Sequence, residues 1–283
     1  MSKARPSAPR DFGRRFSFVA FGVPISLESD HETLLEKSQK LVKAAFGGRA
    51  RIVADPNAGI EHRFRLVSEN GNLALYRNGI LLDSGPSERH FLQFLNHKLR
   101  LEVAEHTKHR VFIHAGVVGW NGKAIVLPGV SFAGKSTLTA ELVRNGAEYY
   151  SDEYAVIDKT GKVGPFPRLI SLRLAGDNGE TGVSAEALGG VQGRHCIPVG
   201  MVLFTRFSKG SKWMPEELGV GAGIMELIPN TLTMRQDPAF SLKVLDLVAQ
   251  RAIMVRSPRG EAGKFAKFLL DFFDKHTKLA KMT

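Results

Sequence analysis

The sequence predicts an α/β protein, with a core built on a mixed β-sheet and a smaller α+β subdomain before it. Three observations predict this fold class. The apolar run at 124–127 leads into a glycine-rich loop, and a helix-like stretch follows at 136–145. A strand-like segment at 111–120 precedes that run, and Asn121-Gly122 between the two is a strong hairpin signal. Before residue 108, shorter strand-like segments are interspersed with two helix-like ones.

The first 107 residues are predicted to hold a tail and the smaller subdomain. Residues 1–14 contain two prolines and several basic side chains, which predicts a flexible basic tail. Residues 15–107 predict the N-terminal α+β subdomain, because helical periodicity and short strands separated by Asn-Gly turns both occur there. The expected elements are a strand at 16–27, a helix at 31–46, strands at 63–67, 73–77 and 80–83, and a helix at 87–106.

The hairpin at Asn121-Gly122 determines which residues of its two strands face each other. If these two residues form the turn, Trp120 pairs with Lys123, and counting back along both strands puts His114 opposite Gly129. A histidine on an apolar strand is commonly a hydrogen-bonded core residue. This register instead brings His114 to the mouth of the glycine-rich loop, so we predict a functional role for it.

The loop at 129–136 reads Gly-Val-Ser-Phe-Ala-Gly-Lys-Ser and matches the phosphate-binding pattern G-x-x-x-x-G-K-[ST]. Its glycines allow positive φ, so that successive N–H groups can converge on phosphate oxygens at the N-terminus of a helix. Lys135 is expected to reach the β- and γ-phosphates, and Ser136 to offer its hydroxyl to Mg²⁺. The sequence therefore predicts ATP and Mg²⁺ as cofactors. The residues expected to bind the nucleotide are Gly129, Val130, Ser131, Phe132, Ala133, Gly134, Lys135, Ser136 and Thr137.

Two acidic residues follow the next expected strand, 147–151. Strand, helix and strand should form a crossover, which places the end of that strand beside the phosphate loop, at the carboxyl edge of the sheet. There Asp152 is expected to hold Mg²⁺ together with Ser136, and Glu153 to accept a proton from an attacking hydroxyl. Because the metal needs only one carboxylate, Glu153 could instead face solvent.

His114, the loop and the acidic pair together resemble the catalytic domain of HPr kinase/phosphorylase, in the phosphoenolpyruvate-carboxykinase-like branch of phosphate-loop proteins. The resemblance is specific over about residues 110–160, where Glu153 stands in place of the family's second aspartate. It implies a P-loop kinase core at 108–274, followed by a basic tail at 275–283. The implied reaction is Mg²⁺-dependent transfer of the γ-phosphoryl group of ATP to a serine hydroxyl. The catalytic residues are then expected to be His114, Lys135, Asp152 and Glu153.

The resemblance is closer to the divergent HPr-kinase-related proteins, whose acceptors vary, so we predict a protein or peptide acceptor. A small-molecule kinase of the same fold, or an ATP-binding regulatory switch without an acceptor, are the alternatives. The family's later arginine-bearing signature is not identified here, so phosphorolysis is not predicted. Arg168, in the loop after the acidic pair, is predicted to be a surface residue in preference to one that stabilises the transferring phosphoryl group.

The remaining chain predicts further strands and helices of the core. The last helix carries aromatic and aliphatic residues at helical spacing, which favours packing in the core over a membrane or partner face. The expected elements are strands at 169–174, 200–207 and 253–255, helices at 216–227 and 238–250, and a last helix with Phe265, Phe268, Leu269 and Phe272 on its packed face.

Composition narrows the partners and the compartment. The formal net charge is +11, but residues 1–15 carry +4 of it and residues 251–283 carry +5. Basic ends without a clustered aromatic-basic face do not favour nucleic-acid binding. No apolar run is long enough to span a membrane, and the single cysteine, Cys196, excludes an internal disulfide framework. We expect a soluble cytoplasmic enzyme, with the possibility of a homo-oligomer left open.

Overall fold

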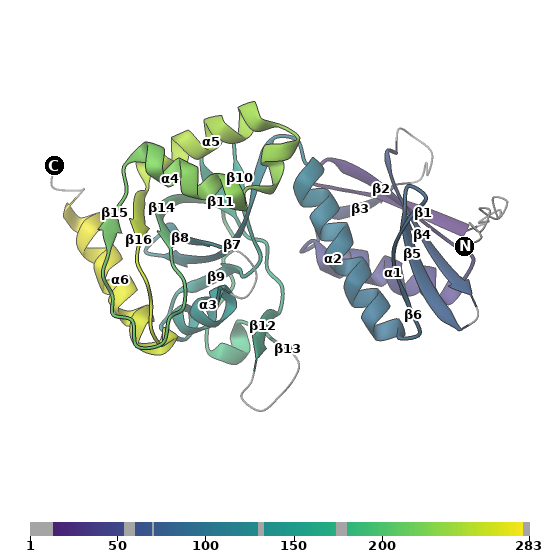
Figure 1. The fold of residues 1–283 in the computed structure, drawn as a ribbon, viewed down its shortest axis with the longest axis horizontal. Coiled ribbons are helices and arrows are strands. Elements are labelled where there is room, and N and C mark those ends of the chain that lie inside the picture. The colour runs from purple at the N-terminus through teal and green to yellow at the C-terminus, as the bar shows by residue number, and fades with distance from the viewer. Residues whose placement is uncertain (1–13, 54–59, 70, 130–132, 174–179, 280–283) are drawn as a thin grey trace, which may run out of the picture. The chain divides into compact units, whose positions relative to one another are not determined.

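The computed structural model describes residues 14–53, 60–69, 71–129, 133–173 and 180–279, and Figure 1 shows its elements. The protein is a mixed α/β protein that divides into two compact units, residues 1–103 and 104–283. Helix α2 (Glu88–His106) continues across the point of division. Each unit is built on its own sheet.

The first unit has a six-stranded sheet in the order β3-β1-β2-β4-β5-β6. Helix α1 (Glu32–Ala45) contacts β1, β2 and β3, and it buries Leu34 and Val42. The helices and the three-stranded meander predicted here are confirmed. The strands are β1 (Arg14–Ala20), β2 (Val23–Ser29), β3 (Ala50–Val53), β4 (His62–Glu69), β5 (Asn72–Arg77) and β6 (Ile80–Gly85).

The single strand predicted at 16–27 is wrong, because the segment turns back on itself. Residues Phe21 and Gly22 both have positive φ, 49° and 82°, and the antiparallel strands β1 and β2 pair on either side of them. Apolar alternation continues through the turn, which is why the periodicity alone did not reveal it.

The second unit contains an eight-stranded mixed sheet in the order β11-β10-β7-β8-β14-β16-β15, with β9 also paired to β7. Strands β7 and β8 are antiparallel, whereas β8, β14 and β16 run parallel. The strands are β7 (Arg110–Trp120), β8 (Lys123–Pro128), β9 (Glu148–Ser151), β10 (Tyr154–Asp158), β11 (Lys162–Gly164), β14 (Ile197–Phe204), β15 (Glu216–Glu217) and β16 (Ile253–Arg256); β12 (Ile170–Arg173) and β13 (Glu180–Val183) form a separate ribbon.

Helices cover both faces of this sheet. Successive residues of a strand point to opposite faces, so Ile125 packs with α3 (Lys135–Arg144) and α6 (Ala262–Leu279), whereas Val126 packs in the cluster that contains α4 (Val220–Leu227) and α5 (Pro238–Arg251). Short 3₁₀ helices lie at Glu186–Leu188, Ile228–Asn230 and Leu232–Arg235. In Figure 1, α3 and the β12–β13 ribbon lie near one end of this unit's sheet.

The hairpin register predicted from Asn121-Gly122 is confirmed. Trp120 pairs with Lys123 and Ala115 pairs with Pro128, and the two turn residues have φ of 50° and 75°. One step further, the Gly129 N–H donates to the His114 carbonyl at 3.2 Å.

Three expectations for the C-terminal part need adjustment. The helix predicted at 216–227 begins only at Val220, because Glu216 and Glu217 pair with β16 as a short edge strand. Phe265 and Leu269 of α6 are buried as predicted, but Phe268 is 57% exposed. Helix α6 also extends to Leu279, so the first residues of the predicted basic tail at 275–283 are helical.

Within the residues that the structure describes, none of the helices combines the length and apolar character needed to cross a bilayer.

Candidate active site

The glycine-rich loop lies between β8 and the N-terminus of α3. Val130, Ser131 and Phe132 fall outside the described residues. Gly134 caps α3 in the left-handed region with φ of 81°, which a glycine adopts at little cost. At the N-terminus of any helix the first N–H groups have no partner within the helix, so such a terminus can bind an anion.

Lys135 is partly buried at this N-terminus, and its Nζ donates to the Gly129 carbonyl at 2.7 Å. Burial lowers the pKa of Lys135 from its usual value to about 8, against the opposing effect of Asp152 and Glu153, which raise it. An ammonium whose charged form is destabilised by burial gains from an added anion. Phosphate oxygens next to the loop would supply that anion.

The acidic pair occupies a break in the pairing along β7. Strand β9 pairs with Val117 to Gly119, and β10 pairs with Arg110 to His114, so the two acids lie between these ladders. The Ala115 N–H donates to the Glu153 carbonyl at 3.0 Å. Asp152 is 5% exposed and Glu153 is 9% exposed. The alternative that Glu153 faces solvent is therefore wrong, because the hydrogen bond from the Ala115 N–H to its carbonyl holds Glu153 against β7.

The carboxylate of Asp152 is held by three donors. Its Oδ2 accepts from Ser136 Oγ at 3.1 Å and from the Ser171 N–H at 3.1 Å. Its Oδ1 accepts from the Tyr149 hydroxyl at 3.0 Å. Burial, reinforced by Asp152, raises the pKa of Tyr149 well above its usual value, so the phenol remains a donor. These bonds orient the carboxylate toward the start of α3.

Arg168 bridges both acids. Its Nη1 donates to Glu153 Oε2 at 2.7 Å, and its Nε lies 3.6 Å from Asp152 Oδ1. Its Nη2 donates to Ser171 Oγ at 2.8 Å. Burial alone would lower the pKa of Arg168, but the two carboxylates raise it above its usual value. The prediction of a surface arginine is therefore wrong, because the segment that precedes β12 brings this side chain, which is 27% exposed, to the acidic pair.

His114 lies on β7 at the edge of this group. It pairs across the sheet with Tyr154, the residue that follows Glu153, and the two rings are 6.1 Å apart. Its carbonyl accepts from Gly129, so the residue adjoins both the loop and the acidic segment. Thr137 is exposed on the first turn of α3.

Sequence reasoning missed Tyr149, Ser171 and the bridging role of Arg168. Tyr149 lies on the expected strand before Asp152, but nothing in that strand's pattern indicates which side its hydroxyl faces. Ser171 contributes its backbone N–H, a group that every residue other than proline carries. No short-range signal could have identified these contacts.

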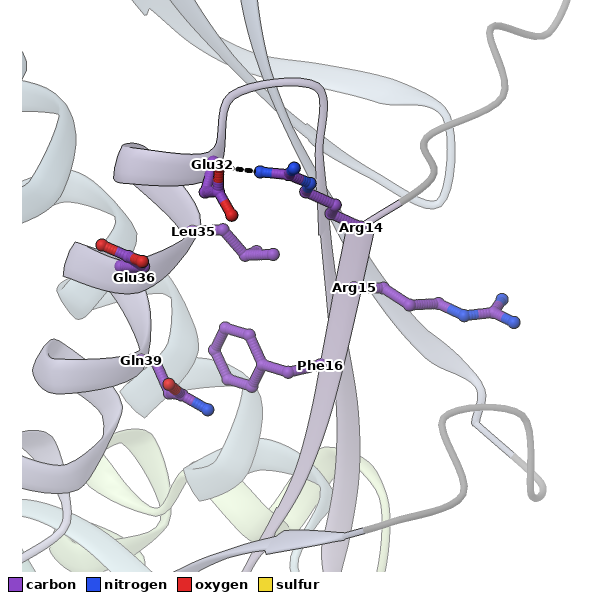
Figure 2. Close-up of a pocket in the computed structure, with 7 residues that line it drawn as sticks. All are labelled: Arg14, Arg15, Phe16, Glu32, Leu35, Glu36 and Gln39. Carbon is purple, nitrogen blue, oxygen red and sulfur yellow. Dashed lines mark ion pairs between the residues drawn. The ribbon is translucent and has the colours of Figure 1, made fainter.

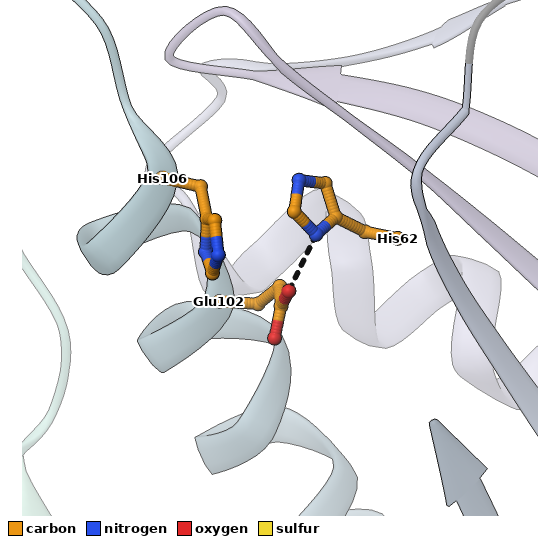
Figure 3. A group of neighbouring side chains, drawn as sticks. All are labelled: His62, Glu102 and His106. Atoms are coloured by element: carbon orange, nitrogen blue, oxygen red, sulfur yellow. Dashed lines mark ion pairs between the residues drawn. The ribbon is translucent and has the colours of Figure 1, made fainter. Parts of the chain in front are cut away.

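Another buried carboxylate, Glu102, lies in the first unit. Figure 3 shows Glu102 of α2 facing His62 of β4, with His106 one helical turn further along α2. The His62 Nδ1 and the Arg77 Nη2 each approach Glu102 Oε1 at 2.5 Å. Two histidines and a glutamate can bind a metal, but here an arginine already occupies the same carboxylate oxygen. We interpret this cluster as a structural one, in which Glu102 pairs with Arg77.

A shallow pocket in the first unit lies between β1 and α1. Figure 2 shows Phe16 and Leu35 at its base, with Glu32 paired to Arg14 above them. Arg15, Glu36 and Gln39 complete the lining. Two arginines and two glutamates balance there, so the pocket offers no excess of positive charge for a phosphate. The candidate active site is therefore the cluster at the start of α3.

Comparisons with known proteins do not establish a family for this chain. No protein-family model matches the chain, and no curated protein is significantly similar to it in sequence. Among solved structures, the chain is similar to the HPr(Ser) kinase/phosphatase from Coxiella burnetii, with 11% identity and a TM-score of 0.30. The match covers 60% of this chain and 98% of that chain. A TM-score of this size does not establish a common fold, so the functional argument rests on the site itself.

Proposed function

We propose that this chain is a Mg²⁺-dependent kinase that transfers the γ-phosphoryl group of ATP to a hydroxyl group, with serine of a protein or peptide as the acceptor. The observation that carries the proposal is the 3.1 Å contact between Ser136 Oγ and Asp152 Oδ2. This contact joins a hydroxyl on the first turn of a helix that follows a glycine-rich loop to a buried carboxylate. Hydroxyl and carboxylate oxygens are hard donors of the kind that Mg²⁺ prefers.

The residues present fit a magnesium-bound triphosphate. Ser136 and Asp152 would hold the ion, which when bound neutralises charge on the β- and γ-phosphates. The Lys135 ammonium would exchange the Gly129 carbonyl for phosphate oxygens. The N–H groups of the first turn of α3 would contact the same phosphates.

The transfer step requires an acceptor of the hydroxyl proton. The hydroxyl oxygen forms a bond to the γ-phosphorus, the bond from that phosphorus to the β–γ bridging oxygen breaks, and the proton passes to Glu153. Arg168, whose Nη1 lies 2.7 Å from Glu153 Oε2, holds that carboxylate in place and brings positive charge close to the transferring group. His114, on the neighbouring strand, is proposed to assist with the proton.

Phosphoryl transfer can be tested with γ-labelled ATP and Mg²⁺ in an extract of the protein's own cells. Asp152→Asn serves as the inactive variant and Asp246→Asn, on α5, as the matched control, since Asp246 accepts a hydrogen bond from the exposed Gln250 and is not a residue of the proposed site. Label in a polypeptide with the unmutated protein and the control, but not with Asp152→Asn, supports the proposal. Label in small molecules alone indicates a small-molecule kinase. Nucleotide binding without transfer indicates a regulatory switch and overturns the proposal.

His114→Ala separates the kinase from the switch. A switch needs the loop and the metal but no proton-handling group. We therefore expect this variant to bind MgATP with unchanged affinity and to lose transfer. Full transfer by the variant would remove His114 from the proposed mechanism.

A further inference from the structure

Arg259 is a buried arginine between β16 and α6 that the proposed mechanism does not use. The residue is only 2% exposed. Its backbone N–H donates to the Arg206 carbonyl at 3.2 Å, and its carbonyl accepts from the Ser208 N–H at 2.9 Å. The guanidinium lies over the Phe207 ring, 5.6 Å from the ring centre. Backbone and ring together fix where this side chain can reach.

The guanidinium reaches the phosphate loop. Its Nη2 donates to the Gly134 carbonyl at 2.8 Å, and its Nη1 donates to the Gly260 carbonyl at 3.3 Å. Its Nε is buried and, among the described residues, has no hydrogen-bond partner. In the same described part of the chain, this guanidinium forms no ion pair with a carboxylate, and the nearby Glu261 is exposed.

The contact reinforces the orientation of the peptide plane at the start of α3, where the Gly134 carbonyl also accepts from the Leu138 N–H at 3.1 Å. In a trans peptide the carbonyl and the following N–H point in opposite directions. Holding the Gly134 carbonyl on the helix side therefore directs the Lys135 N–H outward, to where an anion binds at a helix N-terminus. A Cβ on Gly134 would lie 2.1 Å from Arg259 Nη2, so this glycine also makes the contact possible.

A buried positive charge is costly unless an opposite charge lies near it. Arg168 already pairs with both Asp152 and Glu153. Arg259 therefore places a positive charge at the start of α3 that no described carboxylate pairs. The phosphates of a nucleotide at that end would supply the missing negative charge. The burial of the Arg259 charge and the orientation of the Gly134–Lys135 peptide therefore both indicate a polyphosphate ligand.

We propose that Arg259 is a positioning residue of the phosphate site, which holds the Gly134–Lys135 peptide toward the polyphosphate and adds a second buried positive charge beside Lys135. This inference rests on the proposed nucleotide binding and extends it. It assigns part of the affinity for polyphosphate to a residue 125 positions from the loop.

The test compares Arg259→Gln and Arg259→Lys with Arg256→Gln. Arg256, on β16, is an exposed arginine paired with Glu216 and Glu226, so its loss should leave binding unchanged. Calorimetry gives the affinities for MgATP, MgADP and inorganic tripolyphosphate over a range of salt concentrations, and melting curves check the fold. We expect Arg259→Gln to lose at least tenfold in affinity for all three ligands and to show a weaker salt dependence. Arg259→Lys, which keeps the charge, should recover part of both.

The outcomes separate the two proposals. If the unmutated protein binds none of the three ligands, the proposed function fails and this inference fails with it. If it binds them and a folded Arg259→Gln binds equally well, only the inference is overturned. If Arg259→Gln does not fold, NMR of the unmutated protein gives a second measurement, the resonance of the Arg259 Nε–H. Its absence from the spectrum of Arg259→Lys assigns this resonance. It should shift on addition of tripolyphosphate, and an unchanged resonance at saturation would overturn the inference.

Discussion

Each unit of this protein contains a buried glutamate paired with an arginine, and the two pairs have different surroundings. Glu102 accepts from Arg77 and contacts His62. Glu153 accepts from Arg168, and a second carboxylate beside it contacts a hydroxyl at the start of a helix. A buried ion pair is therefore no mark of function by itself. What distinguishes the second pair is the adjacent helix N-terminus, where Gly134 caps α3 and the partly buried Lys135 lies beside the two carboxylates.

The largest expected effect comes from an isosteric substitution in the second pair. Glu153→Gln removes the proposed proton acceptor and half of the ion pair with Arg168. We expect phosphoryl transfer to fall about a hundredfold or more, with MgATP affinity retained within a few-fold. Single-turnover transfer and equilibrium binding measure the two quantities. If transfer is not reduced, another group accepts the hydroxyl proton, and the Glu153–Arg168 pair would then be structural like the Glu102–Arg77 pair.

The hydroxyl of Tyr149 offers a sharper test of how Asp152 is oriented. Tyr149→Phe removes the donor to Asp152 Oδ1 while preserving the ring. Loss of a group that orients a metal-binding carboxylate commonly costs about tenfold or more in metal affinity, and we expect Mg²⁺ affinity to fall by this amount. Tyr150→Phe is the matched control, because that hydroxyl donates to the His195 carbonyl. Equal Mg²⁺ affinities in the two variants would contradict the proposed role of Asp152.

The pH dependence of binding tests the lysine. In the free protein the pKa of Lys135 is about 8, and a bound polyphosphate raises it, because an anion stabilises the ammonium. Below pH 8 the lysine is charged in both states, so affinity is highest. Above pH 8 binding must take up a proton, and affinity falls by up to about tenfold per pH unit. Tripolyphosphate titrations without Mg²⁺ should show this decline, and Lys135→Met should not. If the affinity of the unmutated protein does not change with pH, the proposed contact between Lys135 and phosphate is contradicted.

The smallest effect on activity is expected in the first unit. Glu102→Gln weakens the pair with Arg77, which is about one-third exposed, so we expect a loss of about 1 kcal/mol in the free energy of unfolding. Urea unfolding measures it. Phosphoryl transfer should remain unchanged, because Glu102 belongs to the first unit and is not one of the residues of the proposed site. A loss of transfer without a loss of stability would show that this cluster also serves the reaction.

Much of the local structure could be predicted because it depends on neighbouring residues. The Asn121-Gly122 turn has two positive φ angles that few other residue pairs accept, and that turn determines the register bringing Gly129 to His114. Where turn chemistry was weaker, prediction failed. Phe21-Gly22 reverses the chain inside what looks like one apolar strand, and Glu216 leaves a helical pattern to pair with β16.

By itself the sequence determined the order of strand, glycine-rich loop and helix, and the positions of Ser136 and Asp152, because periodicity and turn residues act over a few positions. Only the tertiary structure decided that Arg168 and Tyr149 meet the acidic pair, and that Arg259 holds the Gly134 carbonyl. Those contacts depend on which way each side chain faces after the β12 ribbon and α6 pack against α3. Packing between segments far apart in the chain leaves no local pattern in the sequence.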